Sequence, residues 1–448
     1  MHSLIVPALL AAAREAPAAV SPIVAADTAW MLMSTALVLL MTPAAGFFYG
    51  GLVRAKNVLN TMMMCVASLA VVGVLWALAG YSLAFGGSGR WIGGAQYLLL
   101  RGVGIEAHGS IPHLLFMTYQ ATFAIVTAVL IAGAVVERMR FSAYLAFIAL
   151  WSLVVYAPLA HWVWGGGWLS QLGVLDYAGG TVVHINAGVA AVVATMLVGN
   201  RKDYGRQAML PHNVPFVFLG TSLLFFGWFG FNAGSALAAN GASVIAFTNT
   251  LLAPAAALAS WMALDAVRTR RATAVGAATA VVVGLVVITP AAGLVSPMSA
   301  LLMGALGAVP SYFVIAWRAR TRLDDSLDVM GGHGIGGVTG ALLTGIFADA
   351  HWGGTNGLLF GNPAQLGIQA MGVLATIAYS GIATFGVLTL VGLALPLRAA
   401  KRAEGIGMDI AEHGEEAYAE GEGAVLVFAD AANAARAEPR RALEVGVA

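Results

Sequence analysis

Residues 176–198 read DYAGGTVVHINAGVAAVVATMLV, and this stretch decides the class of fold. After Asp176 it contains no Asp, Glu, Lys or Arg. It provides the roughly 20 largely apolar residues that a helix needs to cross a hydrocarbon core of about 30 Å. One such stretch also suits a buried helix in a soluble protein, but its repetition along the chain does not.

Eleven windows of the chain are long and apolar enough to be membrane spans. They cover residues 28–50, 58–85, 113–136, 141–162, 178–198, 214–236, 243–265, 272–292, 296–317, 330–348 and 369–397. Of the 448 residues, 60% are hydrophobic and 10% are charged, whereas a soluble domain has about 25% charged residues. We therefore predict an all-α polytopic membrane protein with eleven transmembrane helices. The net charge of +1 does not indicate a nucleic-acid partner, and the single cysteine excludes an intrachain disulfide.

The basic residues predict how these spans are oriented. Counted from the first span, the odd connections hold 13 Lys and Arg residues, and the even ones hold only Arg90 and Arg101. The 13 are Arg54, Lys56, Arg138, Arg140, Arg201, Lys202, Arg206, Arg268, Arg270, Arg271, Arg318, Arg320 and Arg322. Because short basic loops stay on the cytoplasmic side, we expect a multi-pass protein of the inner or plasma membrane. Its N-terminus would lie outside and its C-terminus in the cytoplasm.

The fifth and tenth spans share a pattern that indicates an internal repeat. Asp176 precedes His184 by eight residues, and Asp325 precedes His333 by eight. Small or hydroxyl residues then recur 3, 4, 7 and 11 positions after each histidine, on one helical face. They are Ala187, Gly188, Ala191 and Thr195 in the fifth span, and Gly336, Gly337, Gly340 and Thr344 in the tenth. Because five spans per repeat is an odd number, the two repeats are inverted and a final helix follows them.

This organisation divides the chain into five parts. Residues 1–27 form a leader, 28–198 the first five-helix repeat, 199–348 the second, 349–397 an extracellular loop with the eleventh helix, and 398–448 a cytosolic tail. The leader contains an apolar run, residues 4–13, which is too short to span a membrane and suits the core of a signal peptide. No Lys or Arg precedes that run, so a cleaved signal peptide and an uncleaved leader both stay open.

The inverted repeat places His184 and His333 near the middle of the membrane. At 1.5 Å per residue, eight residues carry each histidine about 12 Å inward from opposite sides, which leaves them about 6 Å apart in depth. Sites of inverted repeats lie near this midplane, and an ionisable residue there is a functional candidate by default. The alternative is that each histidine only satisfies a backbone carbonyl. No third ligand or nucleophile shares this depth, so we predict no metal, no cofactor and no enzymatic activity.

Seven segments resemble the signature motifs of the ammonium transporter (Amt/Mep/Rh) family, in the family's order over residues 28–418. They are FFYGGLVR (47–54), QATF (120–123), GAVVER (133–138), HWVWGG (161–166), DYAGGTVVHINAG (176–188), GWFGFNAGS (227–235) and DVMGGHG (328–334). Trp164 favours the Amt branch, since Rh members usually lack it. Tyr119 and Met330 stand where many members have Phe, and Tyr119 could alter the outer cage.

The resemblance implies a homotrimer of eleven-span subunits with one pore in each. It also implies an outer ammonium recruitment site, a phenylalanine gate below that site and twin histidines in the pore. The matching residues are Phe123, Trp164 and Ser235 at the outer site, Phe123 and Phe231 at the gate, His184 and His333 in the pore, and Asp176 as the aspartate of the signature. For Asp176 we favour a structural role as the N-cap of its helix over direct proton transfer.

The predicted function is therefore that of an ammonium transporter or channel. An aromatic cage attracts NH4+ by about 2 kcal/mol when the ion is desolvated. An apolar pore then passes NH3 after deprotonation, with a separate relay for the proton, and excludes K+, which has no proton to lose. Methylammonium is a second candidate substrate.

The tail suggests regulation and an alternative function. Residues 404–418 resemble the family's cytosolic tail, which packs against the inner faces of the subunits, and in the family a PII-type signalling protein can plug the pore from this side. The alternative is an ammonium sensor that signals through this tail and a PII-type partner. Residues 419–448 show no clear periodicity, and we expect them to be mobile.

Overall fold

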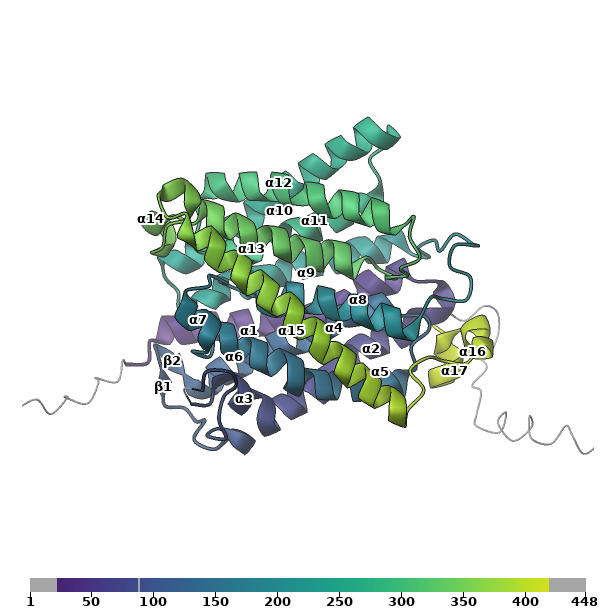
Figure 1. The fold of residues 1–448 in the computed structure, drawn as a ribbon, viewed down its shortest axis with the longest axis horizontal. Helices are drawn as coiled ribbons and strands as arrows, with labels where there is room; N and C mark the ends of the chain where they lie inside the picture. The colour runs from purple at the N-terminus through teal and green to yellow at the C-terminus, as the bar shows by residue number, and fades with distance from the viewer. Residues whose placement is uncertain (1–21, 88, 419–448) are drawn as a thin grey trace, which may run out of the picture.

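Long helices follow one another along residues 22–87 and 89–418, the part of the chain that the computed structural model describes (Figure 1). Ten of these helical segments are long and apolar enough to cross a membrane. The remaining predicted span, the tenth, is helical over Met330–Phe347 but less apolar, because it contains seven glycines and His333. The predicted all-α polytopic fold is thus confirmed. The leader up to residue 21 and the tail beyond residue 418 lie outside the described residues.

The structure gives each element the following bounds. The helices are α1 (Ala25–Leu52), α2 (Val58–Leu75), α3 (Tyr81–Phe85), α4 (His113–Val135), α5 (Phe141–Trp151), α6 (Ala157–Val163), α7 (Trp168–Leu172), α8 (Asn186–Val198), α9 (Val214–Ala233), α10 (Gly241–Thr269), α11 (Ala274–Ile288), α12 (Pro297–Arg318), α13 (Gly336–Phe347), α14 (Ala350–Gly353), α15 (Ala364–Ala394), α16 (Lys401–Ile406) and α17 (Met408–His413). Short π-helical stretches join or precede some of them, at Trp76–Gly80, Ser152–Tyr156, Gly180–Ile185 and Met330–Ile335. One antiparallel hairpin pairs β1 (Ala107–His108) with β2 (Ile111–Pro112).

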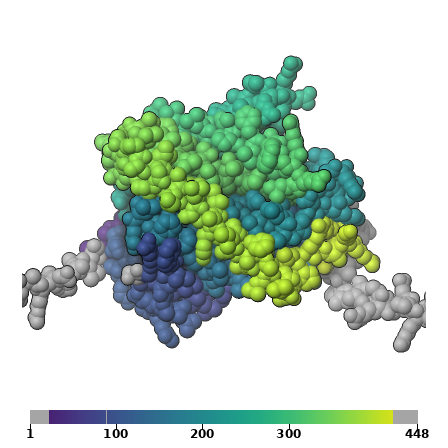
Figure 2. All heavy atoms as spheres, in the orientation of Figure 1, coloured from purple at the N-terminus to yellow at the C-terminus, as the bar shows by residue number. Residues whose placement is uncertain are grey.

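The last span differs from its predicted bounds of 369–397. Helix α15 starts five residues earlier, directly after Pro363, and ends at Ala394. Proline suits the start of a helix because it has no N–H to leave unpaired. At the other end Leu395 is extended, as expected for a residue that precedes a proline, here Pro396. Helix α15 crosses the outside of the bundle as a diagonal band (Figures 1 and 2).

Glycines allow the central helices to approach closely. Helix α9 presents Gly220, Gly227 and Gly230 to α1, and a Cβ atom at any of them would collide with α1 backbone atoms. Association of helices in a membrane depends on such small residues, because the surrounding lipid is as apolar as the helix surfaces. The α1–α9 pair consequently has the most extensive helix–helix contact in the described part of the chain.

Four of the five odd connections meet at one end of the bundle, which we call the basic end: residues 53–57, 136–140, 199–213 and 319–329. The described tail docks there, with Lys56 Nζ donating to the Gly405 carbonyl at 2.6 Å and the Asn60 amide donating to Asp409 at 2.8 Å. Figure 1 shows α16 and α17 beside this end, away from the β1–β2 hairpin. The alternation of connections between two ends is the arrangement that the predicted topology requires.

A buried ion network holds the basic end together. The Glu137 side chain is fully buried and pairs with Arg54 at 2.8 Å and Arg201 at 3.2 Å. Arg201 also pairs with buried Asp324 at 2.7 Å. Burial alone would raise the pKa of Glu137, but Arg201 and Arg54 outweigh it and hold that pKa below its usual value. The network thus ties four connections that are far apart in the sequence.

We predict that Glu137→Gln destabilises the protein by about 3–5 kcal/mol, because two arginines lose their buried counterion. Since the pKa of Glu137 is lowered in the folded state, its contribution exists above the ordinary carboxyl pKa. That contribution disappears as the pH falls through the lowered value. Unfolding of purified protein in detergent, monitored against temperature and pH, measures both effects.

The matched control is Asp203→Asn. Asp203 lies 4.0 Å from Arg54 and its side chain is 32% exposed, so its removal should cost about 1 kcal/mol or less. Equal losses in the two variants would contradict a stabilising role for the buried network.

Candidate functional site

His184 and His333 lie against each other inside the bundle. Their Nδ1 atoms are 3.3 Å apart, and the ring centroids are separated by 5.3 Å with an interplanar angle of 22°. Both side chains are buried. The sequence predicted similar depths, and the structure brings the two rings into direct contact.

Glycines at matching positions make this contact possible. Gly188, four residues after His184, lies against Gly334, and a Cβ atom on Gly188 would overlap the Gly334 backbone. Gly337, four residues after His333, approaches the Cβ atom of His184 in the same way. Each histidine also lies in a six-residue π-helical stretch that precedes α8 or α13. The two spans therefore share local structure as well as sequence pattern, while the wider inverted repeat stays a prediction.

The close Nδ1–Nδ1 distance constrains the protons of the pair. Two neutral imidazoles can share this contact only if one Nδ1 carries a proton and the other accepts it. Their Nε2 atoms must then differ, one being an acceptor and the other a donor. In the described part of the structure the Nε2 atom of His184 has no hydrogen-bond partner. The pair is thus chemically asymmetric even though its sequence context is matched.

An aromatic cluster covers the histidines on the side away from the basic end. Phe123 and Phe231 face each other at 4.3 Å between ring centroids, and Phe123 meets the edge of Trp164 at 5.9 Å. The Trp164 indole N–H donates to the Asp176 carbonyl at 2.8 Å, which fixes its ring. The structure therefore brings together the aromatic residues that the resemblance assigned to the outer site and the gate.

Ser235 presents hydrogen-bond acceptor capacity to the aromatic cluster. Its hydroxyl donates to the Phe231 carbonyl at 2.8 Å, which uses its only proton. Tyr119, which stands where many family members have Phe, places its hydroxyl 3.3 Å from Ser235 and 2.9 Å from the Phe231 carbonyl. The departure at Tyr119 therefore braces this site through hydrogen bonds that Phe could not make.

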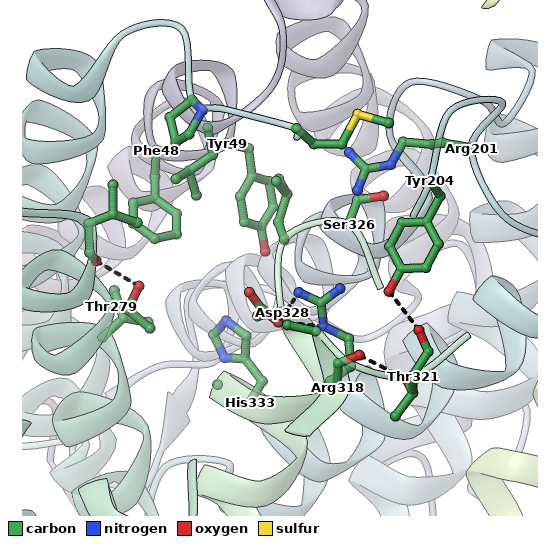
Figure 3. Close-up of a pocket in the computed structure, with 18 of the residues that line it drawn as sticks. Phe48, Tyr49, Arg201, Tyr204, Thr279, Arg318, Thr321, Ser326, Asp328 and His333 are labelled. Carbon is green, nitrogen blue, oxygen red and sulfur yellow. Dashed lines mark hydrogen bonds and ion pairs between the residues drawn. The ribbon is translucent and has the colours of Figure 1, made fainter. Parts of the chain in front are cut away.

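Three cavities follow one another along this line of residues. An aromatic cavity of about 390 Å³ is lined by Phe123, Trp164 and Ser235. A small cavity of about 20 Å³, close to the size of one water molecule, lies between Phe231 and the two histidines. A basic-end cavity of about 520 Å³ reaches His333 from the other side (Figure 3). His333 lines both the small cavity and the basic-end cavity, so these two cavities adjoin. The aromatic cavity is separated from the small one by the facing rings of Phe123 and Phe231, which close the series at that point.

The two aspartates of the repeat are bonded differently. The Asp176 carboxylate accepts hydrogen bonds from the Gly179, Gly180, Thr181 and Val182 amides and from the Thr181 hydroxyl. This is the geometry of a helix cap. Asp325 accepts one bond, from the Met330 amide at 2.7 Å, and burial raises its pKa. The Asp176 carboxylate therefore has its hydrogen-bond acceptors largely occupied, whereas the Asp325 carboxylate accepts only one hydrogen bond from the described residues.

Two features of the site had no counterpart in the sequence interpretation. Trp228 stacks on His184 at 5.5 Å and donates its indole N–H to Thr289 at 3.0 Å. Trp228 lies three residues before Phe231, so both side chains are on one face of the helix. This spacing is the feature of the sequence that could have predicted the place of Trp228. Arg318 and Asp328 form an ion pair of 2.7 Å in the wall of the basic-end cavity (Figure 3). No group of three or more metal-binding side chains was found among the residues described.

Fold and site together define a multi-pass membrane protein in which a series of cavities lies beside two contacting histidines. The model of the Ammonium Transporter Family matches residues 29–418, which is most of the chain. The chain belongs to the ammonium transporter family.

Relatives and solved structures agree with this assignment. The chain is 46% identical over 398 residues to an ammonium transporter of Bacillus subtilis, covering 88% of this chain and 98% of the relative. It is 47% identical over 397 residues to one of Aquifex aeolicus, covering 88% and 93%. The crystal structure of Candida albicans Mep2 is 36% identical with a TM-score of 0.78, covering 82% of this chain and 84% of that one. A structure described as a sensor Amt protein is 29% identical with a TM-score of 0.82, covering 87% and 98%.

We predict that Asp176→Ala lowers the free energy of unfolding by about 2 kcal/mol or more, because several amides of the first turn lose a charged acceptor. Asp176→Asn keeps one acceptor oxygen and should fall between that variant and the wild type. Thermal unfolding in detergent measures both. Asp349→Ala is the control, since Asp349 caps the short helix α14 through one bond to the His351 amide. An unchanged unfolding temperature in Asp176→Ala would contradict the capping role.

Proposed function

We propose that the chain takes up ammonium across the inner or plasma membrane by recruiting NH4+ in the aromatic cavity, deprotonating it and conducting NH3 past His184 and His333. The observation that carries this proposal is the narrow cavity between Phe231 and the paired imidazoles, which lies between two larger cavities and shares His333 with the one at the basic end. We place the aromatic cavity outside and the basic end in the cytoplasm, because the odd connections hold 13 of the 22 Lys and Arg residues and the even connections hold two.

The composition of the aromatic cavity supports recruitment of a cation. Phe123 and Trp164 offer ring faces for cation–π attraction, about 2 kcal/mol when the ion loses water. The Ser235 hydroxyl, with its proton directed to Phe231, keeps lone pairs for an N–H donor. An ion that donates hydrogen bonds in several directions, such as NH4+, fits this set better than K+.

The small cavity supports passage of a neutral species. It holds about 20 Å³ among mostly apolar side chains, the Tyr49 phenol and the two imidazoles, and the described residues that line it include no Asp, Glu, Lys or Arg. An unpaired ion moved into such surroundings costs several kcal/mol or more. Ammonium can avoid this cost by losing a proton, which K+ cannot do. The Nδ1–Nδ1 contact of the histidines offers a route for that proton.

Assembly and partners belong to the same proposal. The resemblance supports a homotrimer and a PII-type partner at the basic end, where the tail docks on α2 through Asp409 and Asn60. The similarity to the structure described as a sensor Amt protein supports a second candidate function, ammonium sensing through the tail. The two functions differ in whether substrate crosses the membrane, so a transport current separates them.

The proposal predicts that His184→Ala and His333→Ala each abolish ammonium transport or its selectivity against K+. Proton transfer by a positioned side chain contributes a factor of about 10²–10⁴ to rates, so a variant without the relay should fall to background. Loss of selectivity would instead indicate that water and ions enter the widened passage. Currents of reconstituted protein on solid-supported membranes, with ammonium and with K+, measure both results.

His351→Ala is the control for this experiment, because His351 is exposed on α14 and lines none of the three cavities described. Full ammonium current with K+ excluded in both single pore variants would overturn the assignment of the histidines.

The docked tail predicts an effect of truncation on transport and on partner binding. Truncation after Arg402 removes the Lys56–Gly405 and Asn60–Asp409 contacts while leaving the passage intact. We expect lower uptake and weaker capture of a PII-type protein, since the surface at the basic end loses its acidic segment. Truncation after Tyr418 retains every described tail contact and is the control. If the shorter chain transports and binds like the full chain, the tail has no regulatory role.

A further inference from the structure

His108 lines the aromatic cavity together with the residues of the proposed recruitment site. The cavity wall includes His108 and Phe116 as well as Phe123, Trp164 and Ser235. None of the motifs that relate the chain to its family contains His108. An imidazole at this place is therefore a candidate contact for whatever enters the cavity.

A rigid support holds His108 over the cavity. It ends strand β1, whose partner β2 contributes Ile111, a buried residue, and the intervening turn uses Gly109 with a positive φ of 64°. The Ser110 carbonyl accepts a hydrogen bond of 2.9 Å from the Val24 amide, which ties the hairpin to the start of α1. The ring position of His108 is thus set by the fold.

Two rings stack on the imidazole of His108, which lines the cavity. Its centroid lies 4.3 Å from Phe116 with an interplanar angle of 29°, and 4.8 Å from His113 with an angle of 16°. His113 is held in turn by a hydrogen bond between its Nε2 and the Tyr81 hydroxyl. A neutral His108 can therefore accept a hydrogen bond from a cation in the cavity.

The charge of His108 depends on few neighbours. His113 faces it directly, with Tyr81 and Tyr97 behind that ring. Glu106 acts electrostatically on His113, and Tyr177 lies in the wall of the same cavity. Partial burial, followed by His113, lowers the pKa of His108 below its ordinary value. Since that value is about 6.5, His108 is neutral at pH 7 and gains its charge in more acidic medium.

The geometry points to His108 as a further residue of the recruitment site, one that favours ammonium binding as a neutral imidazole and opposes it as an imidazolium. A positive ring in the cavity wall repels NH4+ and can no longer accept its hydrogen bond. Acid should therefore raise the apparent KM for ammonium while the maximal current changes little. This inference rests on the proposed function, because it assumes that ammonium enters through the aromatic cavity.

The test compares the wild type with His108→Gln and His108→Lys on solid-supported membranes, between about pH 4 and about pH 7.5, a range that extends well below the ordinary histidine pKa of about 6.5. Ammonium stays protonated over this range, so its supply is constant. In the wild type, KM should rise several-fold toward the acid side. His108→Gln should have a near-normal KM at neutral pH and lose that rise, while His108→Lys should have a high KM throughout. His351→Gln is the matched control at the same end of the bundle.

Two outcomes overturn different claims. If the wild type gives no saturable ammonium current at any pH, the proposed function fails. If it transports, but His108→Gln keeps the acid rise in KM or His108→Lys keeps a normal KM, ammonium recruitment does not depend on His108. A loss of maximal current with unchanged KM in both variants would also overturn the inference, because it would indicate a purely structural role.

Discussion

The close approach of two glycine-rich spans is the constraint on which the site depends. Where Gly188 meets Gly334, the backbones come near enough for His184 and His333 to touch through their Nδ1 atoms. A larger side chain at Gly188 would push the spans apart and separate the rings. The same glycines make the tenth span the least apolar one, so packing and hydropathy are in conflict there. The structure resolves the conflict by burying that span inside the bundle, away from lipid.

The charged side chains lie away from the small cavity beside the histidines. Glu137, Arg201 and Asp324 are buried, but they lie in connections at the basic end, where each finds an oppositely charged partner. Burial makes such groups costly when unpaired, so the network also selects one arrangement of the four connections. Apart from the Tyr49 phenol, the histidines are the ionisable groups next to the small cavity, and they need no counterion while neutral. A passage built this way can handle protons without holding a fixed charge.

Most of the fold was predictable because its signals are local. Apolar length identified the spans, and the repeat pattern placed His184 and His333 at similar depths before the structure showed their contact. The contacts of Tyr119 and Trp228 were not predictable, because each depends on where a distant backbone or ring lies. The place of His108 depends on a hairpin of four paired residues, too short to leave a periodic pattern. The sequence therefore predicted which functional residues share one helix, but it did not predict which residues of different helices contact one another.

The two large cavities differ in charge, and this bears on how the passage works. Among the described residues, the ionisable side chains in the wall of the aromatic cavity are His108 and Tyr177. The wall of the basic-end cavity instead contains Arg201, Arg318 and Asp328. Arg201 and Arg318 are paired with carboxylates, so Arg320 in the same wall supplies the net positive charge. Such a charge opposes entry of a cation from that side, but it has little effect on a neutral molecule. Such charges act over about 8 Å at physiological ionic strength, which is enough to cover the cavity mouth. These charges cannot change the equilibrium of passive transport, because the free-energy difference between the two sides of the membrane does not depend on the path between them. Under the proposed function, what they change is the rate at which NH4+ formed in that cavity returns to the histidines rather than leaving to solution.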